Sequence, residues 1–287
     1  MLAEQTAAAV DKEESLFDIN GFHVIRGLFD PKQALEDAKG LRASIDTSYL
    51  GKSISDGCNR APYTNEYLFR PEIQAAAQAL RDQPRFLQVC DVQLDHNRDN
   101  WHRDSACRTF GMADWDESRD KYLCYKLIVY LECGHAGLGV LPGSHRSKVK
   151  VQRTDLDDFL IIDRDQEVDR PYVEDNSARQ LLVGMGSGDA LLFDERLLHC
   201  GRRYDDKGKI AENFIEPKST IAYVFGGEDR HSWRFYSFFR YLRPELKYRD
   251  FDPEFRDRLK EHGMLPDFYQ KDLFALHPDE REQITGK

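Results

Sequence analysis

The chain has 287 residues, with 41 Lys and Arg against 51 Asp and Glu, and a formal net charge of -10. This acidic balance argues against nucleic acid as a partner, because binding phosphates requires clustered basic side chains. Six cysteines without a Cys-x-x-Cys pair argue against a zinc knuckle or a disulfide framework, and no apolar run is long enough to span a membrane, so we expect a cytoplasmic protein.

The N-terminal part of the chain predicts one short strand and two helices. Residues 22–28 alternate into a strand, and Asp30-Pro31 supplies the N-cap and first position of a helix that runs to about residue 46. Residues 52–70 are polar and irregular, and the Ala-rich stretch 71–83 is helical. We expect the two helices to cover the outer face of a sheet.

From Phe86 onward a period of two residues predicts mainly strands. The predicted strands cover residues 86–94, 122–132, 138–141, 180–183, 190–193 and 220–225. Many short strands separated by Gly- and Pro-containing turns indicate a mainly β fold with flanking helices, closed as a cupin-like jelly roll, or double-stranded β-helix. We interpret residues 1–287 as a single domain.

Two long connections interrupt the predicted strands, at residues 106–121 and 147–179. Long loops in compact domains are commonly lids or binding loops, so we interpret residues 147–179 as a substrate lid, with disorder as the alternative. The C-terminal extension, residues 228–287, is too rich in aromatic residues for a disordered segment. We expect it to pack on the barrel, or on a second subunit of a homodimer.

Three residues that could bind a metal follow the ends of predicted strands. His102 and Asp104 come directly after one strand, and His199 closes another, which would bring them to one mouth of the barrel. Two imidazoles and one carboxylate leave three coordination positions open, as in non-heme Fe(II) oxygenases, although these donors also suit Zn(II) or Mn(II). A His-x-Asp triplet alone is a weak signal, since a second one at residues 277–279 has no later histidine to complete a trio.

The segments around these residues resemble a known family. Residues 137–145 read Gly-Leu-Gly-Val-Leu-Pro-Gly-Ser-His, residues 188–193 read Gly-Asp-Ala-Leu-Leu-Phe and lead to His199, and residues 17–30 form a matching opening. Together they resemble the phytanoyl-CoA dioxygenase family of Fe(II)/2-oxoglutarate-dependent oxygenases over residues 17–226. The resemblance implies a jelly-roll core.

The resemblance also implies the chemistry of the site. In this interpretation His102, Asp104 and His199 bind Fe(II), and 2-oxoglutarate and O2 are co-substrates. A C–H bond of a small-molecule substrate is oxidised, and succinate and CO2 are the co-products. In related halogenases a small residue replaces the carboxylate ligand, so the presence of Asp104 favours hydroxylation or another oxidation over halogenation.

Four basic residues are candidates for binding the distal carboxylate of 2-oxoglutarate. The family usually has an Arg on the strand after the distal His, where this chain has Lys218, a compact point charge in place of a bidentate fork. Lys126, within an apolar predicted strand, is a second candidate, because a Lys is rarely buried without a partner. Arg202 and Arg203 are the others. We assign substrate contacts, with ordinary loop packing as the alternative, to Trp101, Arg103, Arg108, Phe110 and Trp115.

Two functions of other classes stay open on the sequence alone. The first is a non-catalytic jelly-roll protein that binds a metal or an oxoacid, which the displaced carboxylate anchor favours weakly. The second is a metalloenzyme that does not use 2-oxoglutarate, such as an isomerase or a cysteine-type dioxygenase. The substrate itself is not selected, because the family acts on acyl thioesters, amino acids, phosphonates and secondary metabolites, and a fold does not choose among them.

Overall fold

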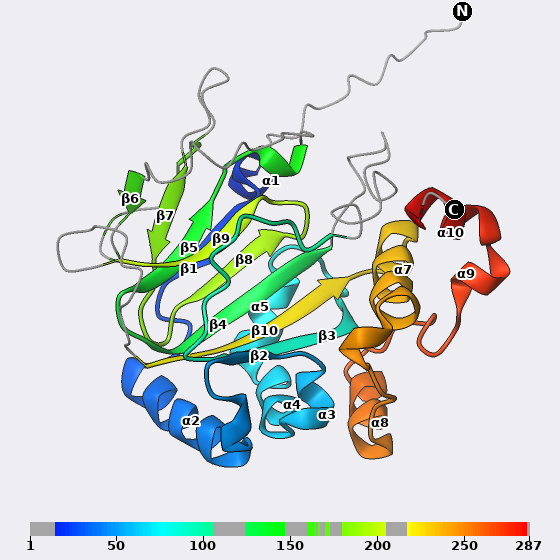
Figure 1. Ribbon diagram of the computed structural model, residues 1–287, viewed down its shortest axis with the longest axis horizontal. Helices are drawn as coiled ribbons and strands as arrows, with labels where there is room; N and C mark the ends of the chain where they lie inside the picture. Colours follow the sequence, from blue (N-terminus) through cyan, green and yellow to red (C-terminus); the bar gives the residue numbers. More distant parts are fainter. Residues whose placement is uncertain are drawn as a thin grey trace, which may run out of the picture.

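Two facing β-sheets form the centre of the molecule (Figure 1). The structure, a computed structural model, describes residues 15–105, 124–146, 160–162, 164, 166, 170–172, 180–204 and 217–285. Within these ranges the larger sheet has the order β1-β8-β4-β10-β3-β2, and the smaller sheet has the order β6-β7-β5-β9. Neighbouring strands are antiparallel except β6 and β7. The strands are β1 Phe22–Ile25, β2 Lys52–Ile54, β3 Arg85–Leu94, β4 Tyr125–Cys133, β5 Ala136–Val140, β6 Leu160–Ile162, β7 Leu181–Gly184, β8 Ala190–Asp194, β9 His199–Arg203 and β10 Lys218–Gly226.

The alternation of side chains along the strands explains why two separate cores form. In β4, Leu127 and Val129 belong to the core between the larger sheet and the helices, whereas Ile128 and Tyr130 face the smaller sheet. Leu138 of β5 packs in that second core. The predicted mainly β fold, a jelly roll with flanking helices, is confirmed.

The helices cover the outer face of the larger sheet and one end of it (Figure 1). The predicted helix from Pro31 is α2, and the Asp30 side chain caps it by accepting from the backbone N–H groups of Lys32 and Gln33. The predicted helix at residues 71–83 ends five residues early. The α-helices are α1 Leu16–Asn20, α2 Pro31–Ser44, α3 Gly57–Arg60, α4 Tyr63–Leu68, α5 Pro71–Gln78, α7 Arg230–Ser237, α8 Pro253–Glu261, α9 Leu273–Leu276 and α10 Pro278–Thr285.

The expectation of an irregular segment at residues 52–70 was wrong. This segment contains β2, α3 and α4, and it buries Ile54, Tyr67 and Leu68 in the larger core. These elements are three to six residues long. A helix or strand this short has too few residues for a periodic pattern, and tertiary burial decides its conformation instead.

The C-terminal extension packs on the same chain. Phe251 stacks on Phe86 of β3 with ring centroids 5.9 Å apart, and Phe235 and Phe239 belong to the larger core. Buried Arg234 of α7 forms an ion pair with Glu280 of α10. The aromatic residues are therefore explained by packing within one subunit, and a homodimer through this extension stays a prediction.

The segment predicted to be a lid, residues 147–179, lies largely outside the described residues. Its described part includes β6, which pairs in parallel with β7. Asn20 fixes another part, since its side chain donates to the carbonyl of Arg170 at 2.9 Å and accepts from the N–H of Tyr172 at 2.9 Å. These contacts attach the segment to the N-terminal helix α1.

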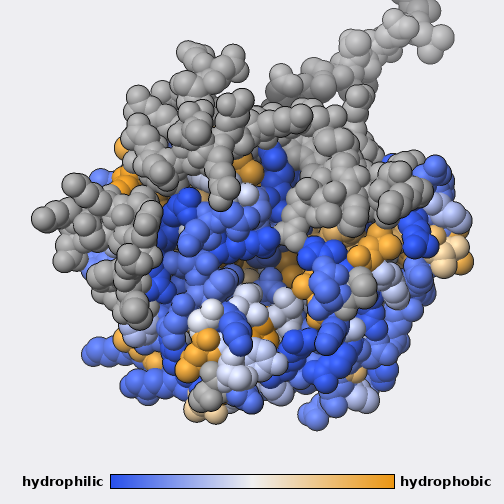
Figure 2. All heavy atoms as spheres, viewed as in Figure 1, coloured by the Kyte–Doolittle hydropathy of each residue, from blue (hydrophilic) through white to orange (hydrophobic). Residues whose placement is uncertain are grey.

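The outer surface is mainly hydrophilic on the face seen in Figure 2, and apolar side chains gather there beside the C-terminal helices. In the part of the chain that the structure describes, each helix is too short or too polar to cross a membrane. Both observations direct attention to the interior of the barrel.

Candidate metal centre

The backbone brings the two histidines of the predicted trio together. The N–H of His102 donates to the carbonyl of His199 at 2.9 Å, and the N–H of His199 donates back to His102 at 3.0 Å. His199 begins β9, so its predicted place at the end of a strand was wrong; the short turn after β8 leads directly into it. In that turn the carbonyl of Glu195 accepts from the N–H groups of Asp104 and Ser105, at 3.0 and 2.9 Å.

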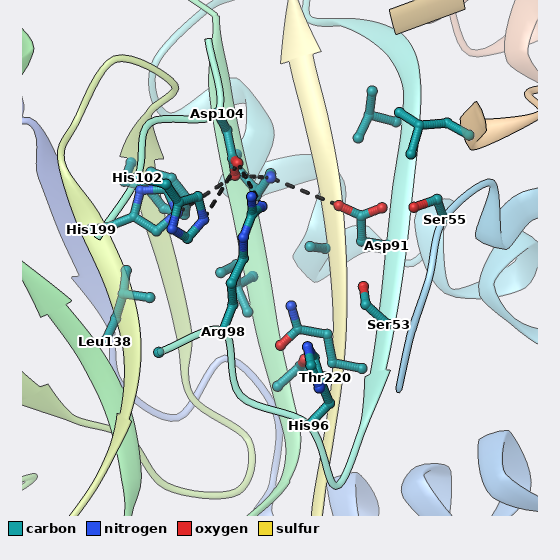
Figure 3. A pocket seen from close by; sticks show the side chains of 18 of the residues that line it. Ser53, Ser55, Asp91, His96, Arg98, His102, Asp104, Leu138, His199 and Thr220 are labelled. Carbon is teal, nitrogen blue, oxygen red and sulfur yellow. Dashed lines mark hydrogen bonds and ion pairs between the residues drawn. The ribbon is translucent and has the colours of Figure 1, made fainter. Parts of the chain in front are cut away.

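The three side chains converge at one side of a cavity between the sheets (Figure 3). His102 Nε2 lies 3.6 Å from Asp104 Oδ1, and His199 Nε2 lies 3.5 Å from Asp104 Oδ2. One ligand atom of each residue lies within 4.8 Å of the others. Among the described residues, no second group of three His, Cys, Asp or Glu side chains converges in this way.

Both imidazoles are held in the state that a metal ligand requires. Nδ1 of His102 lies 2.7 Å from the carbonyl oxygen of Asn100, and Nδ1 of His199 lies 3.0 Å from that of Leu197. A carbonyl oxygen can only accept, so each Nδ1 donates its hydrogen and each Nε2 keeps a lone pair. Burial, assisted by the neighbouring His199, lowers the pKa of His102 to about 2. Two imidazoles that can bind through Nε2, together with a carboxylate, fit Fe(II), and they also suit Zn(II) and Mn(II).

Asp104 is buried together with a cation. Nζ of Lys126 donates to Asp104 Oδ2. Burial alone would raise the pKa of Asp104, but the Lys126 ammonium and the two imidazoles lower it well below its ordinary value. The carboxylate is therefore ionised, as metal coordination requires.

Lys218 lies in the same cavity, which has a volume of about 310 Å³. Its ammonium donates to the side chains of Gln93 and Asn97 at 3.3 and 2.8 Å, and to the carbonyl of His96 at 3.2 Å. Lys218 is only 5 % exposed, and burial beside these neutral acceptors lowers its pKa to about 8. Thr220, two residues further along β10, lies near His96, at the end of the cavity away from His102 and His199 (Figure 3).

A different set of groups lines the side formed by β2 and β3. Ser53, Ser55 and Asp91 face the cavity there, as Figure 3 shows. Burial raises the pKa of Asp91, although Lys126 acts in the opposite direction. The C-terminal extension completes this wall with Phe239, Arg243, Leu246 and Tyr248.

Of the three other basic residues proposed to bind 2-oxoglutarate, Lys126 lines the cavity, and Arg202 and Arg203 are not among its described lining residues. Arg202 donates to the carbonyl of Asp99, and among the described residues neither Arg202 nor Arg203 lines the cavity. Lys126 does line it, but at the metal-ligand carboxylate. Arg98, which the sequence did not single out, also lines the cavity, with Nη1 3.6 Å from Asp104 Oδ1.

Of the predicted substrate residues, two fall in the described part of the chain. Arg103 donates to the carbonyls of Arg196 and Ser144, at 2.8 and 3.2 Å, and so binds the turn before His199 to the turn after β5. Trp101 is half-buried, and neither residue is among the described residues that line the cavity. The remaining three lie outside the described residues: Arg108, Phe110 and Trp115.

No protein-family model matches the chain, and no curated protein matches it either. Solved structures do match. HygX from Streptomyces hygroscopicus, with nickel and 2-oxoglutarate bound, is 19% identical with a TM-score of 0.51, covering 74% of this chain and 84% of that chain. EctD from S. alaskensis, with 2-oxoglutarate and 5-hydroxyectoine, is 15% identical with a TM-score of 0.50, covering 79% of each chain.

These likenesses show the fold. The chain is a double-stranded β-helix of the kind found in HygX and EctD. The sequence motifs resemble the phytanoyl-CoA dioxygenase family, but no family model matches the chain, so membership of that family stays a prediction. Activity and ligands therefore depend on the site itself.

Proposed function

We propose that the protein is an Fe(II)/2-oxoglutarate-dependent oxygenase, similar to the phytanoyl-CoA dioxygenase family, that oxidises a C–H bond of a small molecule. The observation that carries this proposal is a trio of candidate metal ligands in one cavity with a buried ammonium, that of Lys218, whose hydrogen-bond acceptors among the described residues are all neutral. Succinate and CO2 would be the co-products.

The trio would hold Fe(II) through Nε2 of His102, Nε2 of His199 and the carboxylate of Asp104. When bound, Fe(II) together with 2-oxoglutarate supplies the activation of O2 that C–H oxidation requires. The protein's contribution is to fix neutral imidazoles by their Nδ1 hydrogen bonds and to keep the carboxylate ionised. The interior of the barrel also limits access of water to the site.

Lys218 is the proposed anchor for the distal carboxylate of 2-oxoglutarate, and Thr220 a hydrogen-bond donor beside it. A buried ammonium whose partners are all neutral gains the most from an incoming anion. The cavity of about 310 Å³ is at the lower end of the size range of small-molecule sites. HygX and EctD, which share the fold, were both solved with 2-oxoglutarate, and this supports the assignment.

The substrate is proposed to bind against the β2 and β3 side, where hydroxyl groups and a carboxylate face the cavity. Ser53, Ser55 and Asp91 would hydrogen-bond a polar group of the substrate, and Leu246 and Tyr248 would cover it. This arrangement favours a small polar molecule. It also gives the C-terminal extension a direct part in shaping the site.

The test is an anaerobic titration of metal-free protein with Fe(II) and then with 2-oxoglutarate, followed by visible absorption. The expected result is the weak charge-transfer band of a keto acid chelated to iron, and in air a slow release of succinate. His199→Ala should remove both. Iron binding without the band would instead favour a 2-oxoglutarate-independent enzyme or a binding protein, and succinate release that survives His199→Ala would contradict the ligand assignment.

A further inference from the structure

Lys126 is a buried cation that the proposed reaction does not use. It lies in β4 between Tyr125 and Leu127, which face the helices, so the alternation of the strand directs its side chain into the cavity. Only 6 % of the residue is exposed. Burying a lysine charge is costly, and nearby carboxylates reduce that cost.

Three carboxylates surround its ammonium. Asp104 accepts a hydrogen bond through Oδ2, and the nearest oxygens of Asp91 and Glu195 each lie 3.9 Å from Nζ. Glu195 is completely buried. The ammonium therefore lies within an acidic shell that contains one of the proposed metal ligands.

The contact with Lys126 fixes the orientation of the Asp104 carboxylate. The backbone of Asp104 is held by the carbonyl of Glu195, which leaves the side-chain torsions to be set by contacts in the cavity. Lys126 donates to Oδ2, which also lies 3.5 Å from Nε2 of His199, while Oδ1 lies 3.6 Å from Nε2 of His102 and 3.6 Å from Nη1 of Arg98. Hydrogen-bond partners of this kind orient metal ligands, and their loss typically weakens metal binding by about 10- to 100-fold.

We infer that Lys126 is a positioning residue of the metal centre: it holds the Asp104 carboxylate in the orientation that binds the metal. This inference rests on the metal site of the proposed function and needs neither 2-oxoglutarate nor a substrate. It assigns Lys126 a role different from the binding of 2-oxoglutarate.

Repulsion between the ammonium and a divalent cation acts in the opposite direction. Its effect is limited because Lys126 and Asp104, which form a hydrogen-bonded pair, together carry no net charge. Removing the ammonium therefore leaves the Asp104 carboxylate without the partner that orients it. It relieves only a weak net repulsion of the metal ion. The expected net result is weaker metal binding.

The experiment compares metal binding by the wild-type protein, Lys126→Met and Lys126→Gln, with Lys52→Met as the control. Anaerobic titration with Fe(II), and calorimetric titration with Co(II), give the dissociation constants without 2-oxoglutarate. Lys126→Met should raise the metal Kd by about 10- to 100-fold, and Lys126→Gln, which keeps a donor, should recover part of the loss. Lys52→Met removes an exposed lysine of β2, whose ammonium donates to the carbonyl of Ser48, and should leave the metal Kd unchanged.

A readout of geometry separates positioning from a general effect on folding. The visible absorption of the Co(II)-loaded protein reports the arrangement of its ligands, and it should change in Lys126→Met but not in Lys52→Met. If Lys126→Met does not fold, two other variants test whether Lys126 positions Asp104. They are Lys126→Gln and the double variant Lys126→Met with Glu195→Gln, which also removes a buried acidic group.

Equal metal Kd values and Co(II) spectra for wild type and the folded Lys126 variants would overturn the inference. Tighter metal binding in Lys126→Met would overturn it as well, because the ammonium would then oppose the metal. Metal binding with the expected variant effects but without a 2-oxoglutarate band would overturn only the proposed function. A wild-type protein that binds no divalent metal would overturn both.

Discussion

Replacing Lys218 by Met should weaken 2-oxoglutarate binding and at the same time stabilise the ligand-free protein. Burial lowers the pKa of Lys218 from 10.5 to about 8. At about 1.4 kcal/mol per pH unit, keeping this residue charged costs on the order of 3 kcal/mol at neutral pH. Methionine has a similar length and no charge. Allowing for the lost hydrogen bonds to Gln93, His96 and Asn97, we expect a gain of about 1–3 kcal/mol in the free energy of unfolding.

The pH dependence of this gain has a defined sign. Because the folded-state pKa of Lys218 lies below its ordinary value, the folded protein carries the full penalty below pH 8. The penalty decreases as the pH rises from about 8 towards 10.5, where the unfolded chain also loses the proton. The stability difference between wild type and Lys218→Met should shrink over this range. Urea denaturation of the metal-free proteins at several pH values measures it.

The second half of the prediction concerns the ligand. Truncating one partner of a buried charge pair costs about 2–5 kcal/mol, so the Kd of 2-oxoglutarate for the Ni(II)-loaded protein should rise by roughly 100-fold. Arg202→Met is the control, since the Arg202 side chain contacts the carbonyl of Asp99, and it should bind 2-oxoglutarate as wild type does. A Lys218→Met protein that is less stable than wild type, yet binds 2-oxoglutarate equally well, would refute the reasoning.

The remaining predictions concern the metal, the pH and the packing of the barrel. Calorimetry should find that His199→Ala lowers the affinity for Fe(II) or Ni(II) at least 100-fold, because one of three ligands is lost; wild-type affinity would contradict the trio. In wild type, 2-oxoglutarate affinity should be constant below pH 8 and fall about tenfold per pH unit above it, as Lys218 loses its charge; calorimetry that finds no change up to pH 9.5 would exclude Lys218 as the anchor. Gly188→Ala should lower the free energy of unfolding by about 3 kcal/mol, because φ is +87° there and a Cβ would meet the carbonyl oxygen of Phe29. Its control is Gly51→Ala, at φ +73° with open space, which should cost about 1 kcal/mol in the same urea experiment.

The sequence predicted the parts of the site that local patterns encode. His102 and Asp104 stand in one short motif, and the inward face of β4 follows from a period of two residues. Lys218 was proposed from the resemblance, because it stands where the family usually has an Arg, and its role as the anchor stays a prediction.

The contacts that define the rest of the site join residues far apart in the sequence. The sequence left open whether Lys126 points into a polar cavity or reaches an edge of the sheet, and its partner Asp104 could not be identified, because that contact depends on how β4 lies against the loop after β3. Asp91 faces the cavity and stands between Cys90 and Val92 in β3. A charged residue between apolar neighbours in a predicted strand is a signal by which the sequence could have identified it. The contribution of Tyr248 to the cavity follows from tertiary packing alone.

The C-terminal extension has a consequence for how this protein could diversify. The metal ligands belong to residues 102–104 and to His199, whereas residues 239–248, which form another wall of the cavity, are encoded in a separate stretch after the last strand. Substitutions in that stretch can reshape the cavity without disturbing the backbone hydrogen bonds that join His102 and His199. Selection for new substrates can therefore act on one stretch of the gene while the stretches that encode the proposed metal ligands stay constant.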